Sequence, residues 1–116
     1  MDWLARCQRF FCKTPALTDL DACLVDVRSA DEFKAGHLPR ALSLPLEQLR
    51  AQAHALLPDP EAAIVVYCHS GVRSALARRQ LIAMGYVQVS NGGGMARLRR
   101  RLARAAQAAA AGQTGS

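Results

Sequence analysis

The stretch "AAIVVYCHSGVRSALARRQL" spans residues 62–81 and contains an apolar run, a cysteine, a short polar loop and a helical pattern, in that order. The apolar run has no charged residue and is rich in β-branched side chains, which is typical of a buried strand. Beyond the loop, apolar residues recur at helical spacing: Ala77, Leu81 and Met84. The stretch therefore predicts a strand, a loop and a helix, with Cys68 at the carboxyl end of the strand.

Three more short apolar runs predict strands, namely "ACLVDVR" (22–28), "ALSLP" (41–45) and "YVQVS" (86–90). Helical signals separate them. Ser29 and Glu32 have the spacing of a capping box, Gly36 can end that helix, and Pro45 can begin the next one. "NGGG" (91–94) is interpreted as a flexible turn before a last, arginine-bearing helix. Strands that alternate with helices predict an α/β fold with a parallel sheet.

The chain length of 116 residues suits one domain, which we expect over residues 16–104. Residues 1–15 place apolar side chains at helical spacing and predict an amphipathic helix that covers the core: Trp3, Leu4, Cys7, Phe10 and Phe11. The alternative is a helix that meets a membrane surface or a partner. Residues 105–116 are of low complexity and are expected to be disordered.

The net charge of +6 is unevenly distributed, because five of the fifteen basic residues lie close together: Arg97, Arg99, Arg100, Arg101 and Arg104. Without them the balance is ten basic against nine acidic residues, which argues against a nucleic-acid-binding domain. We expect the arginine segment to be a solvated helix face; the alternative is contact with nucleic acid or an anionic membrane. No apolar run approaches the roughly 18 residues of a membrane span, and no secretory signal is expected.

The four cysteines, Cys7, Cys12, Cys23 and Cys68, are expected to be reduced thiols of a cytoplasmic protein. The three histidines do not have zinc-finger spacing relative to them, which disfavours a zinc site: His37, His54 and His69.

The loop after Cys68 has three features that favour a thiolate. Its successive N–H groups from His69 to Arg73 can form an anion-binding nest, the following helix adds the positive end of its dipole, and Arg73 adds a full charge. Gly71 allows the loop to fold tightly. We therefore expect a lowered pKa for Cys68 and a pocket for an oxyanion. The alternative is an inert, buried cysteine.

Two reactions suit a thiolate in an anion pocket: attack on the phosphorus of a phosphoester, or attack on the sulfane sulfur of thiosulfate to give a persulfide. Four residues separate Cys68 from Arg73. A phosphoryl group needs a roomier cradle, whereas a persulfide adds one sulfur atom. Loop size therefore favours sulfur transfer over a phosphatase or an arsenate reductase.

The motif "CHSGVR" (68–73) resembles the active-site loop of the rhodanese family of single-domain sulfurtransferases. "LVDVRSADEFKAGHLPRALSLPL" (24–46) resembles the first signature of that family, and "MGYVQVSNGGGMARL" (84–98) resembles the segment after its catalytic helix. Arg40 and Leu98 depart from the glycine and tryptophan that the family usually has. The resemblance implies a rhodanese-like three-layer sandwich, with a parallel sheet of four to five strands flanked by helices.

The resemblance also implies roles for individual residues. Cys68 would be the nucleophile and persulfide carrier, and Arg73 would bind the anionic donor. The remaining expected substrate-binding residues are His69, Ser70, Gly71, Val72, Ser74, Asp26 and Arg28. Among these, Asp26 and Arg28 are expected near the pocket rim, where they brace neighbouring loops. His37 is expected to be structural.

The implied reaction moves sulfur from thiosulfate to cyanide, a thiol or a protein cysteine, without a metal or an organic cofactor. A monomer is expected, with neither nucleic acid nor a membrane as partner. The alternative is a slow persulfide relay or interaction module that receives sulfur from a partner protein.

Overall fold

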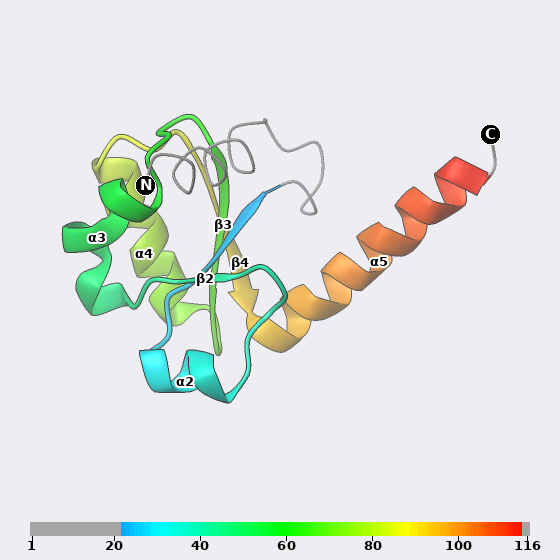
Figure 1. Ribbon diagram of the computed structural model, residues 1–116, viewed down its shortest axis with the longest axis horizontal. Helices are drawn as coiled ribbons and strands as arrows, with labels where there is room; N and C mark the ends of the chain where they lie inside the picture. The colour runs from blue at the N-terminus through cyan, green and yellow to red at the C-terminus, as the bar shows by residue number, and fades with distance from the viewer. Residues whose placement is uncertain (1–21, 115–116) are drawn as a thin grey trace.

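The computed structural model describes residues 22–114, and Figure 1 shows the arrangement of their helices and strands. The elements in chain order are β1 (Cys23–Asp26), α2 (Ala30–Ala35), β2 (Leu42–Ser43), the 3₁₀ helix η2 (Leu46–Gln48), α3 (Leu49–Leu56), β3 (Ala63–Cys68), α4 (Val72–Ala83), β4 (Gln88–Gly94) and α5 (Met95–Thr114). The four strands form one parallel sheet in the order β2-β1-β3-β4. The predicted α/β fold is confirmed. The expected N-terminal helix, Cys7 and Cys12 lie outside the described residues.

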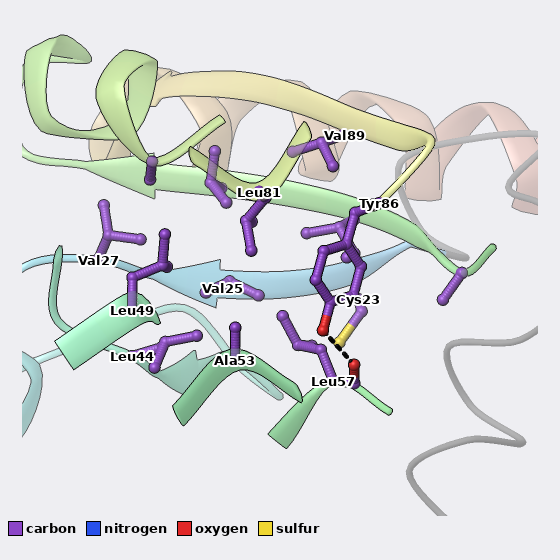
Figure 2. Packing of buried hydrophobic residues seen from close by; sticks show 14 of the residues in the cluster. Cys23, Val25, Val27, Leu44, Leu49, Ala53, Leu57, Leu81, Tyr86 and Val89 are labelled. Carbon is purple, nitrogen blue, oxygen red and sulfur yellow. Dashed lines mark hydrogen bonds between the residues drawn. The ribbon is translucent and has the colours of Figure 1, made fainter. Parts of the chain in front are cut away.

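Side chains of β3 alternate between two cores, as the two-residue period of a strand requires. Ile64, Val66 and Cys68 face the larger core, which the helices α3 and α4 cover. Figure 2 shows this core, in which side chains of β1 meet those of α3.

The opposite face of the sheet carries a second core, to which β3 contributes Ala63, Val65 and Tyr67. Leu98 of α5 is fully buried there, at the position where the family usually has tryptophan. Helices therefore cover both faces of the sheet, which gives the three layers that the resemblance implied.

The predicted start and end of the helix at residues 29–36 hold, whereas the start of the next helix differs. Ser29 and Glu32 form a complete capping box at α2, and Gly36 follows the helix with φ 155°. Pro45 precedes a 3₁₀ turn, η2, and the α-helical part begins only at Leu49.

The prediction of a flexible turn at residues 91–94 is wrong, because these residues belong to β4 and pair with β3. Tyr67 pairs with Gly93 and Cys68 with Gly94, after a register shift between Val66 and Tyr67. A Cβ on Gly94 would lie 2.5 Å from the carbonyl oxygen of His69. The glycines therefore permit close approach of two backbones, which is a different use of glycine from flexibility.

The helix α5 continues through the segment that was expected to be disordered, as far as Thr114. Alanine-rich sequence has high helix propensity, which accounts for the difference. Figure 1 shows α5 starting at the end of β4 and running away from the sheet. Within the part of the chain that the structure describes, no helix is both long enough and apolar enough to span a membrane.

Candidate active site

The carboxyl ends of β1, β3 and β4 lie next to one another at one edge of the sheet, because the strands are parallel and adjacent. The connection from β1 leads to β2 on one side, and the connection from β3 leads to β4 on the other. Ligands of open α/β sheets bind at such a switch point, beyond the carboxyl ends of the strands. Cys68 is the last residue of β3 and therefore lies at this point.

Cys68 is fully buried, and its sulfur is held by the loop that follows it. The backbone N–H of Gly71 donates a hydrogen bond to Sγ at 2.9 Å, and Oγ of Ser74 lies 3.5 Å from the same sulfur. The sulfur thus faces the backbone N–H of Gly71 on the loop and the hydroxyl of Ser74 on the first turn of α4.

The pKa of the Cys68 thiol is lowered, as the sequence predicted. Burial alone would raise this pKa, because it penalises the thiolate. Hydrogen bonds from the Ser74 hydroxyl and from the backbone N–H groups of Ser74, Gly71 and Ser70 outweigh that penalty. The principal stabilisers of the thiolate are therefore Ser74 and the loop amides. The Arg73 charge also interacts favourably with the Cys68 thiolate, because that thiolate is among the causes that raise the pKa of Arg73.

Gly71 makes the turn that aims these amides at the sulfur. It is the N-cap of α4 and has φ 102°, in the left-handed region that favours glycine. A Cβ at this position would also lie 3.3 Å from Cα of Gly93. The side chains of His69, Ser70 and Val72 are exposed around this turn.

Arg73 forms a bidentate ion pair with Glu32 of α2. Its two terminal nitrogens donate to the two carboxylate oxygens of Glu32 at 2.8 and 3.2 Å. Arg73 lowers the pKa of Glu32 to about 2, aided by Ser29 of the capping box. The pair fixes the guanidinium while leaving it partly exposed, with 39% of its side-chain surface accessible.

Asn91 of β4 joins three parts of the site through its side-chain amide. Its Oδ1 accepts hydrogen bonds from Oγ of Ser74 at 2.6 Å and from N of Gly93 at 2.8 Å. Its Nδ2 donates to the carbonyl oxygen of Gly71 at 3.2 Å. Asn91 therefore connects the serine beside the sulfur to the loop and to β4.

Asp26 and Arg28 form a separate, buried cluster at the end of β1. Arg28 donates to both carboxylate oxygens of Asp26, with a shortest distance of 2.7 Å, and to the carbonyl oxygen of Gly36 at 2.6 Å. The guanidinium lies 6.0 Å from the ring centroid of Tyr67, whose pKa burial raises to about 12. The expected contact between the two side chains is present, and it fastens β1 to the segment after α2.

Sequence reasoning missed two residues of the site, Glu32 and Asn91. Glu32 was assigned to the capping box and to the first family signature, although it also follows the end of β1 at the same edge of the sheet. Asn91 was placed at the carboxyl end of a strand, where ligands gather, but it was interpreted as part of a turn and was given no role in the site. His37 makes the local backbone contact that was expected, because its Nδ1 lies 2.9 Å from the carbonyl oxygen of Phe33.

The fold and this cysteine loop together define an α/β domain with a cysteine of lowered pKa at its switch point. The model of the Rhodanese-like domain matches residues 14–98, which is most of the chain. The protein belongs to the rhodanese-like domain family. Within residues 22–114, no three potential metal ligands lie close enough together to hold an ion.

One similar protein is named as a thiosulfate sulfurtransferase and another as a putative sulfur carrier protein. The chain is 32% identical over 71 residues to thiosulfate sulfurtransferase PspE of Escherichia coli, covering 61% of this chain and 68% of PspE. It is 34% identical over 68 residues to the putative sulfur carrier protein YrkF of Bacillus subtilis, covering 59% of this chain and 36% of YrkF. The chain thus matches only part of the length of these relatives.

Solved structures show the same fold. A rhodanese with anions from E. coli has a TM-score of 0.62 at 31% identity, covering 65% of this chain and 88% of that one. The human single-domain sulfurtransferase TSTD1 has a TM-score of 0.56 at 33% identity, covering 63% of this chain and 75% of that one.

Proposed function

We propose that this protein is a sulfurtransferase that carries sulfane sulfur as a persulfide on Cys68. The proposal rests on the environment of the Cys68 sulfur. Sγ accepts a hydrogen bond from the N–H of Gly71 at 2.9 Å and lies 3.5 Å from the Ser74 hydroxyl. These donors lower the pKa of the thiol and so supply the nucleophile.

In the first half-reaction the Cys68 thiolate attacks the outer sulfur of thiosulfate. A sulfur–sulfur bond forms to Cys68, the sulfur–sulfur bond of thiosulfate breaks, and its electron pair leaves with sulfite. The products are the Cys68 persulfide anion and sulfite, so no external oxidant or reductant is needed.

In the second half-reaction a thiophilic acceptor attacks the terminal sulfur of the persulfide. With cyanide the products are thiocyanate and the Cys68 thiolate; with a thiolate they are a new persulfide and the Cys68 thiolate. The enzyme returns to its starting state, and the two steps share no ternary complex. Ping-pong kinetics follow from this sequence.

The other expected site residues have distinct parts in this scheme. Arg73, held by Glu32, and the amides of residues 69–74 bind the oxyanion of the donor, because they combine a positive charge with oriented N–H groups. His69, Ser70 and Val72 form the mouth of the loop. Asp26 and Arg28 brace the loops that neighbour the cysteine loop.

Burial of Cys68 adds a requirement on access. Cys68 has no exposed surface, so a donor reaches its sulfur only after a local movement of the residues around it. The donor must therefore present a narrow end, and the sulfane sulfur of thiosulfate is a single atom. The chemistry also needs a free thiol, which suits a reducing compartment such as the cytoplasm.

A second candidate function is a persulfide carrier that receives sulfur from a partner protein. Two observations favour it: the full burial of Cys68 and the similarity to a relative named as a putative sulfur carrier. A carrier would turn over thiosulfate slowly and accept sulfur quickly from a protein persulfide.

Steady-state kinetics with thiosulfate and cyanide test the proposal. We expect parallel double-reciprocal lines for the unmodified protein, no turnover for Cys68→Ala, and full turnover for Cys23→Ala, which removes the other described cysteine. Turnover that survives in Cys68→Ala would overturn the proposal. Hydrolysis of p-nitrophenyl phosphate without thiosulfate turnover would instead support a phosphatase.

A further inference from the structure

Acidic residues occur only in the N-terminal part of the chain. All nine acidic residues lie within residues 1–61, which also hold seven basic residues. Residues 62–116 hold eight arginines and no acidic residue. The half with the cysteine loop and α5 therefore carries a net charge of +8, and such a field attracts anions.

Three of these arginines lie on one face of α5, because Arg97, Arg101 and Arg104 follow the four-and-three spacing of a helix turn. Leu98 of the same helix points into the core beneath the sheet. The three arginines are exposed, and Arg97 and Arg104 have no acidic partner among the described residues.

The three arginines enclose a hollow of about 380 Å³ together with Asn91, Gly92 and Gly93 of β4. The residues that line it are three arginines, one asparagine and two glycines, and none of them has an apolar side chain. Planar guanidinium groups bind oxyanions through paired hydrogen bonds. The chemistry of the walls therefore suits a multiply charged oxyanion.

The hollow lies against the cysteine loop. Asn91 lines the hollow and donates to the carbonyl oxygen of Gly71, and Gly93 lines the hollow and lies within 3.3 Å of the position of a Cβ on Gly71. Two of the lining residues therefore contact the loop that holds the sulfur. An anion in the hollow would lie next to these two residues.

We infer that this hollow is a second anion site of the sulfur-transfer reaction, which binds a multiply charged oxyanion group through Arg97, Arg101 and Arg104. The inference rests on the proposed function. The oxyanion has two sources: free thiosulfate gathered before it reaches the loop, or a phosphate group on a thiol acceptor. The volume exceeds that of one small oxyanion, since a water molecule takes about 30 Å³ in the liquid.

Binding is measured on the Cys68→Ala protein, which cannot turn over, by titrating pyrophosphate and following backbone amide NMR shifts. We expect saturable shifts at Gly92 and Gly93. The variant Arg97→Gln/Arg104→Gln should weaken this binding at least about tenfold, because it removes two charge-assisted hydrogen-bonding groups from the hollow. The control Arg99→Gln/Arg100→Gln removes the same charge from the same helix outside the hollow, and it should weaken binding less than about twofold.

Kinetics on the catalytically intact protein identify the source of the oxyanion. The acceptors compared are pantetheine and 4′-phosphopantetheine, which differ by one phosphate. Loss of a preference for 4′-phosphopantetheine in Arg97→Gln/Arg104→Gln supports a phosphate on the acceptor. An increase in KM for thiosulfate in that variant, with no such preference, supports the free donor.

Three results would overturn the inference. The first is the absence of shifts at Gly92 and Gly93, and the second is equal weakening in both double variants, which would show only a general basic surface. The third is unchanged kinetics with thiosulfate and with both acceptors. A different result would overturn the proposed function, namely that Cys68 takes up no sulfur. That result is independent of the NMR titration.

Discussion

Ser74 has one hydroxyl hydrogen, and the structure shows where it points. Oγ of Ser74 donates that hydrogen to Oδ1 of Asn91 at 2.6 Å, so toward Cys68 it acts as an acceptor for the thiol hydrogen. When the thiol ionises, the hydroxyl of Ser74 must rotate so that it donates to the thiolate. Oδ1 of Asn91 then retains its other hydrogen bond, from the N–H of Gly93. A single rotation thus links the ionisation of the sulfur to the position of the serine hydrogen.

Replacing Ser74 with alanine should raise the pKa of the Cys68 thiol, because the thiolate loses its side-chain donor while the backbone amides remain. At neutral pH, a smaller fraction of Cys68 is therefore ionised in the variant than in the unmodified protein. We expect alkylation by iodoacetamide at pH 7 to slow by about tenfold, since a hydrogen bond to a charged acceptor contributes about 1.5–3 kcal/mol. The measurement is the pH profile of the alkylation rate.

The control for this experiment is Ser90→Ala, which removes the same group from an exposed position on β4. Its profile should match that of the unmodified protein. If Ser74→Ala left the profile where it was, the loop amides alone would set the pKa, and the role given to Ser74 would be wrong.

The elements α2 and α4 are joined at the site by the ion pair between Glu32 and Arg73. Glu32→Gln should lower kcat/KM for thiosulfate about tenfold, because the guanidinium loses its bidentate anchor and misplacement of a binding group by even 1 Å is costly. Glutamine still fits the capping box, so α2 should keep its start. Glu47→Gln makes the same charge change at an exposed position and should leave kcat/KM unchanged; equal losses in both variants would refute the anchoring role.

The strand β4 supports the cysteine loop from the side, through contact between backbones. Gly94→Ala should place a Cβ 2.5 Å from the carbonyl oxygen of His69 and push the loop away from β4. We expect kcat/KM to fall about 100-fold, as for other small misplacements of catalytic groups. Gly85→Ala also puts a Cβ on a glycine, but it meets no atom within 4 Å and strains only φ, so it should cost stability without loss of turnover per folded molecule.

The sequence predicted β3 and its loop correctly, because an apolar run that ends at a polar loop can be recognised from neighbouring residues alone. The part of β4 at residues 91–94 was missed because glycines in a row are typical of a turn. Their use as contact points with His69 and Val65 depends on residues far away in the chain. Glu32 was missed as a site residue for the same reason, since 41 positions separate it from Arg73.

At the scale of the whole molecule, the buried pair of Asp26 and Arg28 holds the sheet to the segment after α2. Asp26→Asn should lower the free energy of unfolding by about 3 kcal/mol, because it leaves the buried Arg28 guanidinium without its counter-charge. Urea denaturation measures this change. Glu32→Gln breaks the exposed ion pair instead and should shift the urea midpoint little, because water already screens that pair. A small effect of Asp26→Asn would contradict the supporting role of the pair.

The overall fold was predictable because the strands and helices alternate and the strand runs are fully apolar. The uneven charge was also visible in the composition. Neither hydrophobic periodicity nor composition predicts which arginines line the hollow. Their positions depend on where α5 begins after β4.

The central claim is that Cys68 carries sulfur, and the most direct test is intact mass spectrometry after incubation with thiosulfate. We predict that the unmodified protein and Cys23→Ala gain the mass of one sulfur atom, that cyanide removes it, and that Cys68→Ala gains none. An equal gain in Cys68→Ala, or no gain from either thiosulfate or a protein persulfide donor, would contradict the account.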